Sequence, residues 1–211
     1  MHLFRSVAFV IVFPLLIAFT TPASAVTLFK ADLTGSQEVP PNSSTASGFA
    51  TFVLNDAQTE LSAFVTVTGL DFTGSQTPLD PNDDLRNAHI HCCTPPGANA
   101  PVRWGFIGSP FNNTDNDGIT TPFSSGVGGT FQGVWDVNEG NTTATSGPVN
   151  LTNQLPGILA GLSYINFHTV QFGGGEIRGQ ILVPEPPALV LFGLGLLVLL
   201  MAASRREKRM I

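Results

Sequence analysis

The clearest hydrophobic pattern in the chain lies at 60–68, where apolar and polar side chains alternate. A period of two places successive side chains on opposite faces of a β-strand, so we predict a strand with one apolar face. Phe64 is the exception, because it stands among the polar positions, and we expect a loop to cover it. The apolar positions of this strand are Leu61, Ala63, Val65 and Val67.

Short apolar runs of this kind recur along the chain, between segments rich in Gly, Pro, Asn and Thr. Such spacing is typical of an all-β domain, and almost no segment has helical periodicity. We predict a two-layer sandwich of eight strands, with surface loops at 72–84, 108–126 and 138–147. The predicted strands are 27–33, 46–55, 60–68, 87–91, 103–107, 128–134, 163–169 and 176–182.

The first 25 residues have the organisation of a secretory signal peptide. Arg5 supplies the positive charge, an apolar core follows at 7–19, and Ala23-Ser24-Ala25 forms a small-residue cleavage site. The core is too short to serve as a permanent membrane anchor. We therefore expect residues 1–25 to be removed during export.

The other end of the chain predicts one transmembrane helix. The run 187–203 contains no charged side chain, and about 17 helical residues reach roughly 26 Å, enough for a thin hydrocarbon core. The basic cluster at 205–209 predicts a cytoplasmic C-terminus, which leaves the preceding domain outside the membrane.

Four residues precede this run: Val183, Pro184, Glu185 and Pro186. Together with the apolar run and the basic cluster, they resemble the PEP-CTERM sorting signal of bacterial surface proteins. The resemblance implies that an exosortase-type enzyme cleaves near this motif and that the membrane helix is a temporary anchor. We therefore divide the chain into a signal peptide at 1–25, one domain at 26–183 and a sorting signal at 184–211.

The domain at 26–183 is strongly acidic once both terminal segments are removed. Four basic side chains remain against thirteen acidic ones, a formal net charge of −9. This charge excludes nucleic acid as a natural partner, because phosphate backbones are bound by basic surfaces.

Four motifs in the domain resemble the CHRD domain, a module named from chordin and found in bacterial secreted proteins. They are LTGSQEVPP at 33–41, NAHIH at 87–91, YINFHT at 164–169 and GEIRGQI at 175–181. The resemblance implies an immunoglobulin-like Greek-key β-sandwich, and it implies no defined molecular activity. Fold alone does not carry the role of chordin over to this chain.

Three histidines within these motifs suggest a metal site. His89 and His91 lie two positions apart on a predicted strand, so both rings project from the same face. His168 is the third histidine of the domain, and three imidazoles match the ligands of zinc or copper. Glu176 or a water molecule would supply the fourth ligand, and Cys92 is a further candidate. The alternative is that the histidines only brace two strands through hydrogen bonds, with Glu176 or Arg178 as partners.

The chain contains two cysteines, Cys92 and Cys93, directly after His91. Export to an oxidising compartment favours a vicinal disulfide between them. Bonds to another chain and thiolate ligation of copper or zinc beside the histidines remain alternatives. The acidic turns at 80–84 and 115–118 offer oxygen ligands for calcium, but neither has the glutamate that completes an EF-hand.

No motif for nucleophilic catalysis is present, since the chain lacks a Gly-x-Ser-x-Gly elbow. We therefore expect an exported, non-catalytic cell-surface or extracellular-matrix module that binds a surface polymer or another protein. The alternative hypothesis is an exported copper- or zinc-binding protein with redox activity that uses the His-x-His element.

Overall fold

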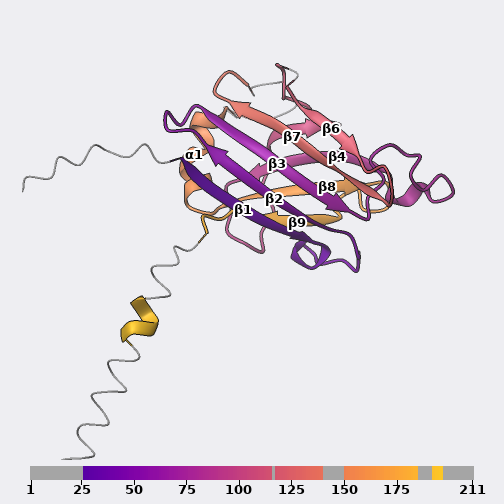
Figure 1. Ribbon diagram of the computed structural model, residues 1–211, viewed down its shortest axis with the longest axis horizontal. Coiled ribbons are helices and arrows are strands. Elements are labelled where there is room, and N and C mark those ends of the chain that lie inside the picture. Colours follow the sequence, from indigo (N-terminus) through magenta and orange to yellow (C-terminus); the bar gives the residue numbers. More distant parts are fainter. Residues whose placement is uncertain (1–25, 116, 140–149, 185–191, 197–211) are drawn as a thin grey trace, which may run out of the picture.

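The computed structural model describes residues 26–115, 117–139, 150–184 and 192–196, and their regular structure is almost entirely β (Figure 1). One α-helix, α1 (Leu151–Leu159), and two short 3-10 turns, η1 (Gly35–Gln37) and η2 (Pro81–Asp83), accompany the strands. The strands are β1 (Thr27–Thr34), β2 (Ser47–Leu54), β3 (Glu60–Thr68), β4 (Leu85–Cys92), β5 (Val102–Ile107), β6 (Ile119–Pro122), β7 (Gly128–Asp136), β8 (Ser163–Thr169) and β9 (Ile177–Gln180).

In the described residues these nine strands form one antiparallel sheet in the order β5-β4-β8-β9-β1-β2-β3-β7-β6. The all-β class is confirmed, but the expected Greek-key arrangement of two separate sheets is not. The reason lies at β1, which pairs with β2 along one edge and with β9 along the other. Lys30 extends this second contact through paired backbone hydrogen bonds with Leu182, 2.9 Å in each direction.

The sheet curls so that its two ends pack face to face, which gives a sandwich-like core. Trp104 of β5 stacks on Trp135 of β7, with ring centroids 5.9 Å apart and planes 2° apart. Phe106 and Phe131 meet across the same interface at 4.4 Å. All core residues of the described chain lie between Phe29 and Ile181, so the segment 26–183 contains this core in full.

Two elements inside the domain differ from the predictions. Strand β6 lies within a predicted loop, and all four of its residues are exposed, so it has no hydrophobic alternation. Helix α1 was not predicted because Pro156 and Gly157 lie within it. Its N-cap is Asn150, whose side chain accepts a hydrogen bond from the Asn153 backbone at 3.1 Å.

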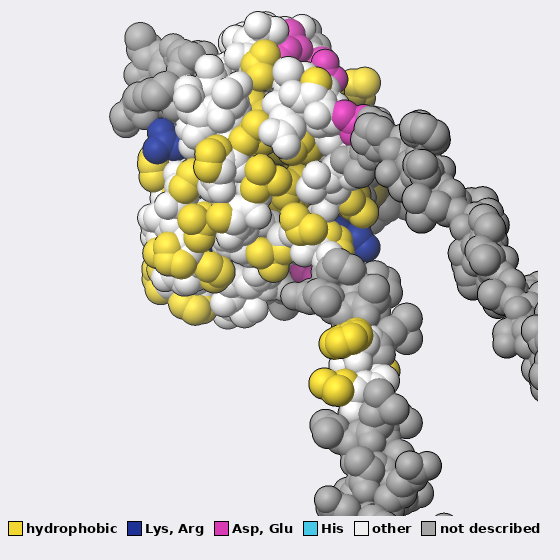
Figure 2. Space-filling model, turned by 90° about the vertical axis from the view of Figure 1, so that its left-hand side faces the viewer, with side chains coloured by type: hydrophobic (Ala, Val, Ile, Leu, Met, Phe, Trp, Pro, Cys, Tyr) yellow, Lys and Arg dark blue, Asp and Glu magenta, His cyan; other side chains and the backbone are white. Residues whose placement is uncertain are grey.

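The expectation for Phe64 is wrong. Its side chain is 48% exposed on the outer face of β3, where it stands opposite Thr51 of β2 and Gln132 of β7. A further exposed face of the molecule carries scattered apolar side chains with few charged groups among them (Figure 2). Single exposed apolar residues are common on protein surfaces, so Phe64 needs no covering loop.

The predicted sorting segments fall largely outside the described residues. The signal peptide at 1–25 lies wholly outside, as do Glu185, Pro186 and most of the predicted span 187–203. Residues 192–196 of that span are helical. Among the residues that the structure describes, no helix is long and apolar enough to cross a membrane.

A candidate metal centre

Strands β4 and β8 carry the three histidines on one face of the sheet. Cross-strand pairing places His89 opposite Asn166, His91 opposite Tyr164, and His168 opposite Asn87. The intervening residues of β4 point the other way, into the core. The histidine face is therefore built by the same alternation that builds the core.

This polar face is enclosed even though it lies away from the core. The exposed fractions of His89, His91 and His168 are 3%, 8% and 8%. The loop after β5 folds over His89, because the backbone of Asn112 and Asn113 bonds to the Gly105 carbonyl. A Cβ at Gly105 would collide with the Pro110 carbonyl oxygen, so this close approach requires glycine.

The three rings converge on one point. Each offers a nitrogen that lies within 4.8 Å of the other two. His89 Nδ1 and His168 Nε2 are 3.3 Å apart. Two ligands of a tetrahedral ion with bonds of 2.0–2.1 Å lie about 3.3 Å apart, so this pair already has the spacing of two metal ligands.

Backbone carbonyls fix the tautomers of two of the rings. His91 Nδ1 lies 2.8 Å from the Ala100 oxygen, and His168 Nδ1 lies 3.1 Å from the Gly173 oxygen. A carbonyl only accepts, so each Nδ1 carries the proton and each Nε2 keeps its lone pair. His91 Nε2 is buried without a hydrogen-bond partner. Metal-binding histidines are commonly oriented in this way, with the second nitrogen bonded to a carbonyl.

The electrostatic environment keeps the imidazoles uncharged. Burial, together with the neighbouring His168 and His91, lowers the pKa of His89 from 6.5 to about 3, while the Ser109 backbone opposes this shift. Burial also lowers the pKa of His91 to about 4, although its bond to Ala100 raises the pKa. The pKa of His168 falls for the same reason, burial. At neutral pH all three lone pairs are therefore available to a metal ion.

A cationic stack lies behind His91. The ring of Tyr164 is parallel to the His91 ring within 5° at 4.6 Å, and the Arg178 guanidinium carbon lies 3.3 Å from the Tyr164 centroid. The Arg178 nitrogens donate to the Ala98 carbonyl at 2.7 Å and to Asn99 Oδ1 at 3.2 Å. These bonds hold the guanidinium in place over the tyrosine.

Glu38 is the carboxylate that faces this stack. It is 4% exposed, and burial raises its pKa to about 7, although Arg178 opposes the shift. Glu38 Oε1 and the Asn166 side-chain oxygen are buried without a hydrogen-bond partner. A cleft of about 360 Å³ opens beside them, with Glu38, Arg178 and Gln180 in its lining. Sequence reasoning missed Glu38, Tyr164 and Asn166, although all three lie in the motifs at 33–41 and 164–169.

The other predicted ligands lie elsewhere. Glu176 accepts hydrogen bonds from Ser44, at 2.6 Å, and from Thr169. Its carboxylate is therefore engaged by the 42–46 segment and by β8. Cys92 points to the core side of β4 and is joined to Cys93 by a disulfide. Among the described residues, the ligand atoms that converge at this place come from the three histidines.

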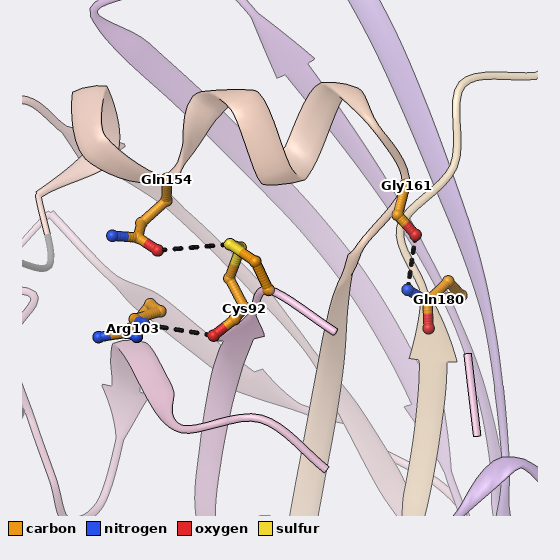
Figure 3. Close-up of a disulfide and its surroundings, with 6 residues drawn as sticks. Cys92, Arg103, Gln154, Gly161 and Gln180 are labelled. Atoms are coloured by element: carbon orange, nitrogen blue, oxygen red, sulfur yellow. Dashed lines mark hydrogen bonds between the residues drawn. A yellow bond between two sulfur atoms is a disulfide. The ribbon is translucent and has the colours of Figure 1, made fainter. Parts of the chain in front are cut away.

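The disulfide packs under α1 (Figure 3). Gln154 Oε1 lies 3.6 Å from Cys93 Sγ, and Arg103 Nε donates to the Cys92 carbonyl at 3.3 Å. A Cβ on Gly157 would collide with both sulfur atoms. The missing side chain of Gly157 therefore makes room for the disulfide next to His91.

The two acidic turns have structural partners of their own. Asp71 accepts bonds from the backbones of Thr73 and Thr77, both at 2.8 Å, beside Asp83 and Asp84. In the other turn, the Asp117 carboxylate accepts from the Val134 backbone at 2.9 Å. These bonds account for the positions of both turns without a calcium ion.

The comparison with known families fits this architecture. The family model described as the CHRD domain matches residues 29–181, a segment that includes the three histidines and both cysteines. A search of curated proteins found no match. Because the family match covers more than half of the chain, this protein belongs to the CHRD domain family.

Proposed function

We propose that this chain is an exported cell-surface module whose domain binds one copper or zinc ion between His89, His91 and His168. The single observation that carries the metal site is the convergence of three neutral, buried nitrogens, two of them 3.3 Å apart. Hydrogen bonds to carbonyls orient two of the rings and leave their Nε2 lone pairs directed inward.

A purely structural role explains these histidines less well. A brace between strands would be expected to use the ring nitrogens in hydrogen bonds. His91 Nε2 has no partner, and the contact of His89 Nδ1 with His168 Nε2 is a hydrogen bond in only one tautomer of His89. A buried polar atom without a partner costs about 1–3 kcal/mol. A metal ion would satisfy all three nitrogens at once.

Export and processing complete the proposal. The CHRD family indicates an extracellular-type module. The signal peptide at 1–25 and the PEP-CTERM motif support secretion, a temporary hold through 187–203 and cleavage by an exosortase-type enzyme near 184–186. The cleaved domain would remain at the cell surface or in the surrounding matrix, where a polymer or another protein is its further partner.

Elemental analysis of the segment 26–183 tests the metal site. The domain is exported to an oxidising compartment without affinity histidines and purified without chelator. We expect one equivalent of copper or zinc per chain, and none in the variant His89→Ala/His91→Ala. Asn87→Ala is the matched control, since Asn87 shares the strand and the face but is no imidazole, and it should keep its metal. A metal-free wild type, or equal metal in the double variant, would refute the site.

Cell fractionation tests the anchor. Deleting residues 183–211 should release the domain into the medium, because the proposed membrane hold is removed. Retention of the truncated protein in the membrane fraction would contradict the sorting proposal, and it would leave the metal site untouched.

A further inference from the structure

We infer that the three-histidine centre selects a monovalent ion, Cu(I), over divalent ions such as Zn(II), and that Arg178 sets this preference. The inference rests on the proposed metal site. It goes beyond that site by naming the charge of the ion and the residue that determines it.

The donor set carries no negative charge. The three ligands are neutral imidazoles, and the convergent group in the described residues includes neither a carboxylate nor a thiolate. Glu176 is engaged by Ser44 and Thr169, and Cys92 is in a disulfide on the opposite face of β4. The charge of a bound ion is therefore not compensated by its ligands.

Burial makes this charge expensive. All three rings are at least nine-tenths buried. The cost of moving an ion from water into a medium of low dielectric constant rises with the square of its charge, so a divalent ion pays about four times as much as a monovalent ion of similar size.

Arg178 adds a fixed positive charge behind the site. Its guanidinium lies on Tyr164, and Tyr164 lies on His91, so the charge is two stacking distances from a ligand. At this separation the guanidinium repels further positive charge on the His91 side of the tyrosine. Glu38, its counter-charge, has a pKa near 7 and is only partly ionised at neutral pH.

The coordination number is compatible with Cu(I), although zinc with three histidines and a water molecule uses the same protein ligands. Structural zinc sites hold four protein ligands, and catalytic sites complete three ligands with water. Cu(I) is stable with three ligands, as this enclosed face provides. Arg178 repels the second charge of Zn(II) across the two stacking distances. With an effective dielectric constant of about 20, this repulsion alone should weaken zinc binding roughly tenfold relative to Cu(I) binding.

Parallel affinity measurements on the segment 26–183 test the inference. Chromophoric chelators compete for Cu(I) under anaerobic ascorbate and for Zn(II) in air, and each titration gives a Kd. We expect tighter binding of Cu(I) in the wild type. In Arg178→Gln the ratio of the zinc Kd to the copper Kd should fall about tenfold, whereas Arg178→Lys, which keeps the charge, should preserve the ratio.

A second variant should shift the ratio of the two Kd values in the opposite direction, and it keeps the buried arginine. Glu38→Gln deletes the counter-charge of Arg178, so at pH 8 the ratio of the zinc Kd to the copper Kd should rise. This variant tests the inference even where Arg178→Gln fails to fold. Equal affinities for both ions in the wild type, or a ratio that none of these variants changes, would overturn the inference and leave the metal site standing. Failure of the wild type to bind either ion would overturn the proposed function itself.

Discussion

Strands β4 and β8 are buried on both faces, and the two faces differ in the polar atoms that remain without a hydrogen-bond partner. On the inner face Ala88, Ile90, Ile165 and Phe167 meet other apolar groups, and removal from water accounts for their position. On the outer face His89, His91, Asn166 and Glu38 are equally enclosed but keep polar atoms without partners.

Unpaired polar atoms occur on the inner side too, but they have another character. The indole nitrogens of Trp104 and Trp135 and the Ser163 hydroxyl lack a partner, but the two indoles belong to large rings whose burial favours folding. On the outer face the unpaired atoms belong to His89, His91, Asn166 and Glu38, and two of these residues are among the three convergent histidines. The difference teaches that apolar burial accounts for most of the inner face, whereas the outer face calls for a ligand.

The largest effect should come from breaking the inner face. Trp104→Ala removes a fully buried ring that stacks on Trp135, and we expect a loss of about 3–5 kcal/mol in the free energy of unfolding. Denaturant titration measures the loss. Metal content of the folded fraction should be unchanged, because Trp104 lies on the opposite face. Trp104→Phe is the milder control, and a metal loss that accompanies either substitution would show that the two faces are not independent.

The outer face should respond to metal and not to packing. In the wild type, a free metal concentration one hundred times the Kd should add about 2.7 kcal/mol to the stability. His168→Ala should abolish this gain, while the stability of its metal-free form changes less, since the ring makes two hydrogen-bond contacts, with the Gly173 carbonyl and with His89 Nδ1. Thermal unfolding with and without metal checks both statements. A metal-dependent shift that persists in His168→Ala would exclude this residue as a ligand.

The alternation of side chains made most of the sheet predictable. The predicted segments 60–68 and 163–169 match β3 and β8 at both ends. The same alternation put His89 and His91 on one face, and the sequence motifs brought His168 into consideration. Alternation does not show which strand pairs with the free edge of another strand. The contact between β1 and β9, which joins the two halves into one sheet, was therefore not predicted.

Two misses have local physical causes. Helix α1 does carry a helical pattern, because Leu151, Leu155 and Ile158 share a buried face behind an Asn150 cap. Pro156 and Gly157 hid that pattern, although the disulfide gives Gly157 a packing reason. Glu176 and Cys92 were candidates for further ligands, but hydrogen bonds engage the Glu176 carboxylate, and Cys92 forms the disulfide with Cys93 that export favours.

A smaller effect should follow at the junction between the disulfide and α1. Gly157→Ala places a methyl group against both sulfur atoms, and overpacking of this kind typically costs about 1–3 kcal/mol. Gly174→Ala is the matched control, since no atom lies within 4 Å of its added Cβ. Urea titration of the oxidised proteins compares the two. Equal stabilities would mean that α1 does not rest on the disulfide.

The smallest effect concerns Glu38 and depends on pH. Its pKa is raised in the folded state from 4.5 to about 7, so folding takes up a proton between these values, and stability from this group falls as pH rises through that window. Glu38→Gln stays neutral and lacks this fall. We expect equal stabilities at pH 4 and a more stable variant at pH 8, because the amide has no charge to bury.

Denaturant titrations from pH 4 to pH 8 measure this difference, with Glu60→Gln as a control at an exposed position of β3. The Glu60 variant should follow the wild type at every pH. If the Glu38 variant also runs parallel to the wild type, the pKa of Glu38 is not raised by folding, and the carboxyl group is ionised at neutral pH. Arg178 would then be fully compensated, and the outer face would hold one charge pair in place of a cation behind a neutral ligand set. This result would remove one support for the preference for a monovalent ion and leave the geometry of the three histidines as it is.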